Sequence, residues 1–211
     1  MERHATQALI AWKSSRNRKP LILKGARQVG KTWLMKEFGK TYYDNTAYFN
    51  FDETDDLRAI FETSKDPHRI IELLSMIADE KILPEKTLII LDEIQECPEA
   101  LNTLKYFKEK ANDYHVIASL LGTLFAQPKS YPVGMVNLLH LYPLTFDEFL
   151  NATDPALYTY YCSIEKEQPI LELFHNRLLE AYNNYLIIGG MPECVAAWID
   201  SSRGCHTARS H

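Results

Sequence analysis

Residues 21–32 read Leu-Ile-Leu-Lys-Gly-Ala-Arg-Gln-Val-Gly-Lys-Thr, and this stretch decides the fold. The three apolar residues predict a short buried strand, and Gly25 then opens the pattern G-x-x-x-x-G-K-T, which closes at Thr32. A periodic apolar stretch follows at once and predicts a helix that ends at Gly39. A strand, a glycine loop and a helix in this order are typical of a loop that binds phosphate groups.

The residue types of this loop explain how it would bind an anion. Glycines let the backbone turn so that successive N–H groups face one phosphate, and the helix adds roughly half a positive charge at its N-terminus. Lys31 would reach the β- and γ-phosphates of a nucleotide, and the Thr32 hydroxyl would bind Mg²⁺. A chance match to the pattern is expected in only about one chain of this length in a hundred. We therefore expect nucleotide binding by Gly25, Ala26, Arg27, Gln28, Val29, Gly30, Lys31, Thr32 and Trp33.

The composition of the 211 residues limits the class of protein. Hydrophobic residues make up 46% of the chain and charged residues 24%, which is enough for a large core in a globular protein. No apolar run has the length of a membrane span and the first residues are polar, so we expect a cytoplasmic protein without a membrane partner. The net charge of −5 argues against general nucleic-acid binding, although it leaves a nucleic-acid partner at a local patch open.

The cysteines and histidines show no metal or disulfide pattern. The four cysteines are scattered, and they are Cys97, Cys162, Cys194 and Cys205. Because they form no C-x-x-C pair and the seven histidines lack ligand spacing, we expect reduced thiols and no zinc site. The basic residues at 13–19 fit a solvated approach to the first strand better than a nucleic-acid surface.

Strands and helices alternate along the first 150 residues. Further strands are expected at 47–51, 87–91, 115–118 and, more weakly, 136–141. The nearly continuous apolar run at 87–91 is typical of a strand that is buried on both faces of a parallel sheet. Helical patterns lie at 4–13, 55–62, 98–111 and from Pro67 to a break at Leu83-Pro84. This alternation predicts an α/β fold with a parallel sheet covered on both faces, which we assign to residues 1–150.

The pattern changes after this core. Residues 145–150 look helical, 151–154 look like a loop, and 170–186 form a long amphipathic stretch. We expect a helical appendage at 151–200 and a disordered tail at 201–211, where apolar periodicity is absent.

Two carboxylates follow the buried strand directly. Asp92 is placed to hold Mg²⁺ opposite Thr32, and Glu93 is placed to orient and polarise a water for attack on the γ-phosphate. Alone, such a pair indicates only a polar strand end, but with the glycine loop it favours hydrolysis. The additional strand at 47–51 and the glutamate after the aspartate are typical of ATPases, and the chain lacks the Asn-Lys-x-Asp element of guanine-specific proteins. Adenine is therefore favoured, with ATP and Mg²⁺ as the expected ligands.

Four motifs together give a resemblance to a known family. The sequence contains residues 25–32, Leu91-Asp-Glu-Ile-Gln95, residues 141–150 (Leu-Tyr-Pro-Leu-Thr-Phe-Asp-Glu-Phe-Leu) and Gly189-Gly-Met-Pro-Glu193 in this order. Over about residues 3–200 it resembles the prokaryotic AAA-type P-loop ATPases that carry a C-terminal domain of unknown function. The resemblance implies a three-layer α/β/α P-loop core followed by a helical segment, with ATP binding and hydrolysis as the activity.

The chain departs from that family in three places. The family usually has Gly-Ser after its fourth strand, where a polar side chain senses the γ-phosphate, and here Ser119 is the candidate for this catalytic role. Where the family commonly has Arg or Lys before the fifth strand, this chain has Met135, which predicts slow turnover. The family pattern stops near Ile199, so we expect a truncated member.

Other activities are also compatible with these motifs. The main alternative is a nucleotide-dependent switch or scaffold that binds ATP with negligible hydrolysis. A small-molecule kinase fits less well, because the sequence has no arginine-rich lid motif and Glu93 suits water activation. A homo-oligomer or a protein partner is compatible with every one of these activities.

Overall fold

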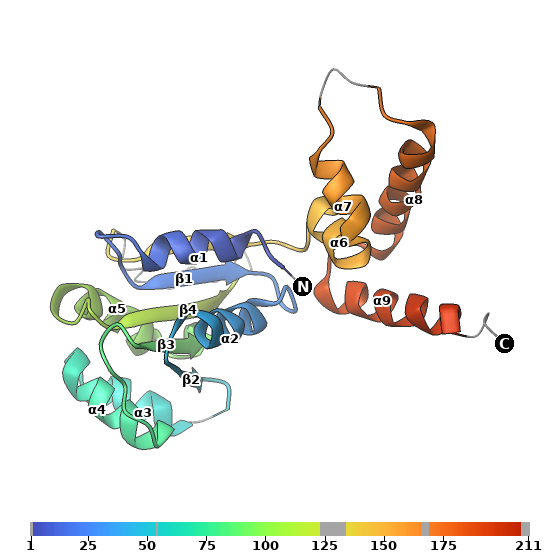
Figure 1. The fold of residues 1–211 in the computed structure, drawn as a ribbon. Helices are drawn as coiled ribbons and strands as arrows, with labels where there is room; N and C mark the ends of the chain where they lie inside the picture. The colour runs from blue at the N-terminus through green and yellow to red at the C-terminus, as the bar shows by residue number, and fades with distance from the viewer. Residues whose placement is uncertain (1, 54, 123–133, 166–168, 208–211) are drawn as a thin grey trace. The chain divides into compact units, whose positions relative to one another are not determined.

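The structure, a computed structural model, describes residues 2–53, 55–122, 134–165 and 169–207 (Figure 1). The chain divides into two compact units. The sheet unit is Ala5–Leu141, and the helical unit combines Met1–His4 with Tyr142–His211.

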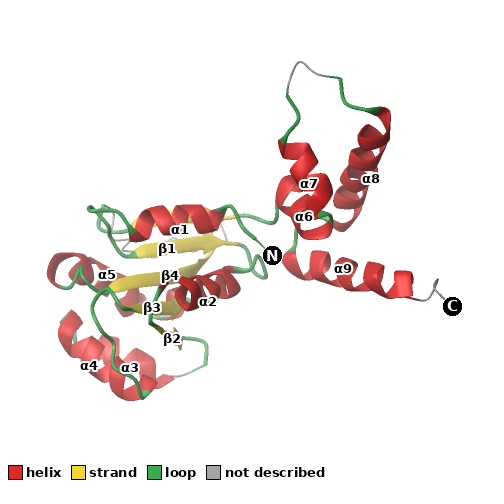
Figure 2. Ribbon diagram, viewed as in Figure 1, coloured by secondary structure: helices red, strands yellow, loops and turns green. Residues whose placement is uncertain are grey.

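A five-stranded parallel sheet forms the centre of the sheet unit (Figure 2, yellow). Its strands are β1 (Leu21–Gly25), β2 (Asn45–Asn50), β3 (Thr87–Asp92), β4 (His115–Leu121) and β5 (Asn137–Leu141). They lie in the order β2-β3-β4-β1-β5, so the first strand in the chain lies between β4 and β5. All the pairs are parallel, and the carboxyl ends of the strands therefore lie along one edge of the sheet.

Helices cover both faces of this sheet. They are α1 (Ala5–Lys13), α2 (Lys31–Tyr42), α3 (Asp55–Thr63), α4 (Pro67–Ala78) and α5 (Pro98–Lys110), with a 3₁₀ turn η1 (Ile94–Glu96) before α5. One buried cluster joins α1 and α2 to one face, and a second joins α3, α4 and α5 to the other. Every residue of β3 is buried, and neighbouring residues such as Leu88 and Ile89 belong to opposite clusters. The three-layer α/β/α fold is thus confirmed, because the alternating side chains of the sheet fill two separate cores.

Helix α2 does not end at Gly39 as the sequence predicted. It continues to Tyr42, and Gly39 lies buried in its last turns. A Cβ atom at Gly39 would lie 2.3 Å from the Thr46 hydroxyl oxygen of β2. This glycine therefore serves the close approach of helix and strand, and it is not a helix stop. Helix α4 also differs from the prediction, because Asp79 adopts a left-handed conformation (φ 52°) and ends the helix before Leu83.

The helical unit contains α6 (Phe146–Thr153), α7 (Pro155–Cys162), α8 (Glu172–Ile188) and α9 (Pro192–Thr207). The expected loop at 151–154 is wrong, because α6 continues to Thr153 and Asp154 caps α7 by accepting a hydrogen bond from Leu157 N at 3.0 Å. The sequence predicted disorder from residue 201 onward, whereas α9 reaches Thr207 and residues 208–211 lie outside the described part. Extending a helix that has already formed costs little per residue, even through polar residues.

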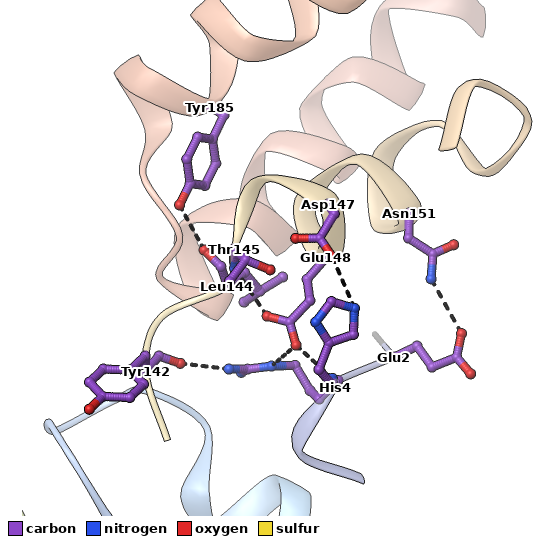
Figure 3. A network of polar contacts seen from close by, with 10 residues as sticks. Glu2, His4, Tyr142, Leu144, Thr145, Asp147, Glu148, Asn151 and Tyr185 are labelled. Atoms are coloured by element: carbon purple, nitrogen blue, oxygen red, sulfur yellow. Dashed lines mark hydrogen bonds and ion pairs between the residues drawn. The ribbon is translucent and has the colours of Figure 1, made fainter. Parts of the chain in front are cut away.

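A network of polar contacts ties the first residues of the chain to α6 (Figure 3). The buried Glu148 carboxylate accepts from Arg3 Nε at 3.2 Å and from the His4 backbone N at 2.7 Å. Its other oxygen accepts from Thr145 N at 3.0 Å and so closes a capping box at the start of α6. Arg3 also donates to the Tyr142 carbonyl oxygen at 2.6 Å. Since Arg3 and Glu148 are both buried, removing Arg3 would take this cation away from a buried carboxylate.

No helix within the described residues is long and apolar enough to cross a membrane. Cys97, Cys162 and Cys194 are free thiols in the structure, and the side chain of Cys205 lies outside the described part.

Candidate nucleotide site

The glycine loop follows β1 at the carboxyl edge of the sheet. Strand β1 pairs with β4 on one side and with β5 on the other, so the loop leaves the sheet between two neighbouring strand ends. In open parallel sheets, ligands bind at this edge, where the order of the strands reverses.

Gly25 is packed against backbone on both sides. A Cβ atom at this position would lie 2.5 Å from the Leu141 carbonyl oxygen of β5 and 3.0 Å from Val29 Cγ1. On the side of β4, Gly122 N donates to the Gly25 carbonyl oxygen at 2.9 Å. Only glycine fits here, and both neighbouring strands hold the start of the loop.

The loop itself has the backbone of an anion-binding turn. Gln28 and Gly30 both adopt left-handed conformations, with φ of 60° and 92°, and Val29 between them is fully buried in the core. Alternation of this kind turns successive N–H groups toward one side. A non-glycine residue at positive φ is strained, and such strain concentrates at functional sites. The buried Val29 side chain anchors the loop, while Ala26, Arg27 and Gln28 are exposed.

Lys31 begins α2 and folds back over the loop. Its ammonium group donates to the carbonyl oxygens of Gly25 at 3.1 Å and Ala26 at 2.9 Å, and the residue is only 5% exposed. Burial lowers the pKa of Lys31, and the negative charges of Glu93 and Asp92 oppose this shift. The helix start has no side-chain cap and no acidic residue in its first turn, so its first N–H groups have no partner within the helix. Trp33, in the same turn, is about half exposed.

The structure brings Thr32 and Asp92 together at the end of β3. Thr32 Oγ1 donates to Asp92 Oδ2 at 2.7 Å, although the two residues are 60 positions apart in the chain. The same carboxylate is 2% exposed and accepts at Oδ1 from the backbone N of Glu93 at 3.2 Å. The hydroxyls of Tyr48 and Ser119 also donate to it. Donors on both of its oxygens hold this carboxylate in one orientation.

Ser119 lies inside β4, whereas the sequence pattern had suggested a position after the strand. The strand continues to Leu121 because its last residues pair in register with Lys24 and Gly25 of β1. The Ser119 hydroxyl donates to Asp92 and accepts from Glu93 N at 2.9 Å, and the residue is fully buried. Ser119 thus belongs to the site through its contacts with both acidic residues.

Glu93 has the left-handed conformation, with φ 52°, and begins the 3₁₀ turn η1. Its carboxylate oxygen Oε2 accepts from Gln95 Nε2 at 2.5 Å, and its side chain is half-buried. The two acidic side chains have different partners, because hydroxyls and a backbone N–H donate to Asp92 and the Gln95 amide donates to Glu93. Such a division is what a metal-binding acid beside a water-activating base requires.

Tyr48 and Gln95 are two site residues to which the sequence analysis assigned no role. Tyr48 lies on β2, and its hydroxyl donates to Asp92 Oδ2 at 2.9 Å. The Lys36 ammonium lies 3.6 Å from the centre of the Tyr48 ring. Burial and the Asp92 carboxylate raise the pKa of Tyr48, which keeps its hydroxyl a donor. The alternation in β2, where Ala47 and Phe49 are buried in the opposite core, was the signal that Tyr48 faces this side.

The set of oxygen donors suits Mg²⁺. Mg²⁺ takes oxygen ligands, keeps several waters and commonly binds through one or two protein groups together with substrate phosphates. Thr32 and Asp92 provide one hydroxyl and one carboxylate at hydrogen-bonding distance from each other. In the described part of the chain no three His, Cys, Asp or Glu side chains gather as a metal site by themselves. The residues present therefore fit a metal that is bound together with a phosphate ligand.

A parallel α/β/α sheet with a G-x-x-x-x-G-K-T loop after its first strand defines the class of P-loop proteins. Within this class, the profile of the AAA domain family matches residues 17–150, well over half of the chain. The chain therefore belongs to the AAA domain family. A comparison with proteins of curated function finds no match.

Comparison with solved structures supports the fold through one match with a TM-score above 0.5. The chain is similar to the Drosophila ORC structure bound to DNA, with a TM-score of 0.51 and 19% identity over 96% of this chain and 60% of that one. It also matches DnaA from Aquifex aeolicus bound to AMPPCP, with a TM-score of 0.45 and 13% identity over 93% of this chain and 58% of that one. A match to C. elegans PCH-2 has a TM-score of 0.45 and 11% identity, covering 95% of this chain and 67% of that one. The chain thus spans about three-fifths of the length of the ORC and DnaA chains.

Proposed function

We propose that this chain binds ATP with Mg²⁺ and hydrolyses the bond between the β- and γ-phosphates. The observation that carries the proposal is the hydrogen bond of 2.7 Å between Thr32 and Asp92. Thr32 directly follows Lys31 in the sequence. Two elements that are distant in sequence, the start of α2 and the end of β3, thereby bring an ammonium, a hydroxyl and a carboxylate to the same edge of the sheet. Membership of the AAA domain family supports nucleotide binding independently of this geometry.

The glycine loop would bind the phosphates. Lys31 lies on two loop carbonyls, so a small rotation of its side chain exchanges these neutral acceptors for phosphate oxygens, which bind a cation more strongly. The first N–H groups of α2 and the left-handed turn at Gln28 and Gly30 add donors on the same side.

Thr32 and Asp92 would hold the metal. Bound Mg²⁺ would neutralise phosphate charge and stabilise the charge that develops during transfer. The Thr32 oxygen can offer a lone pair to the ion while its O–H group continues to donate a hydrogen bond to Asp92. Tyr48 and Ser119 keep the carboxylate in this orientation.

Glu93 would be the general base. Among the described residues, Gln95 bonds this carboxylate at Oε2, so Oε1 can accept a proton from an attacking water. Adenine as the base and a closer relation to prokaryotic AAA-type ATPases with a C-terminal domain belong to the proposal. Adenine is supported by the missing Asn-Lys-x-Asp element and by the sequence resemblance, and the closer relation is supported by the resemblance alone.

The test is hydrolysis of Mg·ATP by the wild type and by Glu93→Gln, with binding measured separately. The substitution keeps size and polarity but removes the base, so we expect phosphate release to fall at least about 100-fold while the Kd for ATP stays within about twofold. Glu109→Gln on the exposed side of α5 is the matched control and should hydrolyse ATP like the wild type. Equal turnover by wild type and Glu93→Gln would contradict the assigned role of Glu93.

The second candidate is an ATP-dependent switch without hydrolysis. It is favoured by Met135, which lies where the resembled family has a cation, and by the four donors that already occupy the Asp92 carboxylate. This function predicts thermal stabilisation by Mg·ATP, worth about 3 kcal/mol at a hundredfold excess over Kd, without phosphate release.

A further inference from the structure

Gln95 connects the Glu93 carboxylate to the backbone of β4. Its Nε2 donates to Glu93 Oε2 at 2.5 Å, and its Oε1 accepts from Leu121 N at 3.2 Å. The side chain is half-buried and leaves the short turn η1 toward the carboxyl edge of the sheet. Both ends of the amide group are therefore used, one by the proposed base and one by the neighbouring strand.

The two partners also fix which way the amide points. A backbone N–H can only donate and an ionised carboxylate can only accept. Leu121 N must therefore meet the oxygen of the Gln95 amide, and Glu93 must meet its nitrogen. A flipped amide would lose both hydrogen bonds, so the network itself determines the orientation.

The strand end that Gln95 contacts also contacts the glycine loop. Leu121 pairs in register with Gly25, and the next residue, Gly122, donates to the Gly25 carbonyl oxygen at 2.9 Å. The same carbonyl oxygen accepts from Lys31 Nζ at 3.1 Å. A continuous series of hydrogen bonds and one strand pairing thus runs from Lys31, through the start of the loop and the end of β4, to Gln95 and Glu93.

We propose that Gln95 is a positioning residue for hydrolysis, which holds Glu93 at a fixed place relative to the glycine loop. By bonding Oε2, it aims Oε1 of the same carboxylate at the space where water would attack. Because its other end is anchored on the strand that also holds Gly25, the base keeps its place with respect to the bound phosphates. This inference rests on the proposed function.

The local fold does not depend on this amide. The turn η1 is closed by backbone hydrogen bonds, from Glu96 N to the Glu93 carbonyl oxygen at 3.0 Å and from Cys97 N to the Ile94 carbonyl oxygen at 3.1 Å. Ile94 is fully buried in the core and fixes the turn further. A substitution of Gln95 that keeps its bulk should therefore leave the fold intact.

The test compares Gln95→Met with the wild type in steady-state hydrolysis of Mg·ATP. Methionine has a similar length but makes neither hydrogen bond, so we expect kcat to fall roughly tenfold or more with the KM and Kd for ATP within twofold. Gln95→Glu, which places a second negative charge beside Glu93, should lower kcat at least as much. Gln7→Met on the exposed side of α1 is the same chemical change at a distant position and should behave like the wild type. A normal kcat for Gln95→Met would overturn the inference.

A second measurement does not need turnover. In the nucleotide-free protein, the Gln95 side-chain amide protons should shift in NMR spectra when Glu93→Ala removes their acceptor, and unchanged resonances would overturn the inference. If the wild type fails to hydrolyse ATP, the proposed function fails, and the tether between Gln95 and Glu93 is then decided by these resonances alone.

Discussion

Among the described residues, both edges of the sheet bury polar groups, and the candidate ligand site lies at the carboxyl edge. At the carboxyl edge, Asp92 is surrounded by hydroxyl donors and lies beside the glycine loop. At the amino edge, His115 at the start of β4 is buried, accepts or donates at 2.6 Å with the Tyr43 hydroxyl, and packs edge-on against the Trp12 ring. Burial of polar groups alone therefore does not identify a functional site, and the kind of partner does.

Two lysines, the buried Lys31 and the half-buried Lys13, show the same contrast. Lys31 donates to loop carbonyls and has Glu93 and Asp92 as charged neighbours. Lys13 donates to the Tyr42 carbonyl oxygen, and its ammonium lies 4.0 Å from the centre of the Tyr43 ring. Burial lowers the pKa of both lysines, so this shift does not distinguish them. They differ in whether a ligand could reach the ammonium group and replace its carbonyl acceptors. Aromatic rings close the amino edge, whereas exposed loop residues border Lys31.

The largest expected effect is on the rate of ATP hydrolysis, and it should differ between substitutions of these two lysines. Lys31→Met should reduce ATP hydrolysis by about 100-fold or more, because it removes a preorganised cation from the proposed phosphate site. Lys13→Met changes the same side chain at the amino edge and should leave the rate within about twofold. Phosphate release measured for both variants at saturating Mg·ATP is the check. Equal losses in the two variants would remove the contrast between the edges.

The second prediction concerns His115 and the pH dependence of stability. Burial, followed by the charges of Arg18 and Lys13, lowers the pKa of His115 to about 4. Within the described residues its Nε2 atom has no hydrogen-bond partner to stabilise a proton. The unfolded chain, with a pKa near 6.5, binds a proton first as the pH falls, so the folded state loses stability from about pH 6.5 down to about pH 4.

His115→Gln removes this titration. Between pH 7 and pH 4.5 the wild type should lose up to about 3 kcal/mol more unfolding free energy than the variant does. Urea unfolding at several pH values measures the difference, with exposed His68→Gln as the control that should follow the wild type. If the unfolding free energies of the wild type and of His115→Gln changed with pH in the same way, the lowered pKa assigned to His115 would be contradicted.

The smallest expected effect is that of removing one tyrosine hydroxyl at each edge of the sheet. Tyr48→Phe removes one donor from Asp92, and we expect hydrolysis to fall a few-fold with a stability loss of about 1 kcal/mol. Tyr43→Phe removes the partner of His115 and should cost a similar amount of stability without changing the rate. Thermal unfolding and phosphate release measured on both variants separate the two edges. A rate change in Tyr43→Phe would contradict this division.

Local sequence patterns predicted most of the fold, and they also indicated the residues at the centre of the candidate site. The glycine loop, the buried run of β3 and the helix that starts at Pro67 each depend on residues that are close together in the sequence, which is why these elements were predicted. The prediction that α2 ends at Gly39 was wrong, because a glycine is needed there for the close approach of the Thr46 side chain, which belongs to another element. Tyr48 and Gln95 had no assigned role for the same reason, since their partners come from other strands. Sequence spacing shows residue types, but contacts between strands appear only in the folded chain.

The helical unit is discontinuous in sequence, and this affects how it could be isolated. The polypeptide crosses between the units twice, once near residues 4–5 and once near 141–142. A fragment that starts at Tyr142 would lack Arg3 and would leave the buried Glu148 without its cation. An expressible version of this unit therefore needs residues 2–4 supplied as well, for example by a circular permutation that fuses them to the fragment.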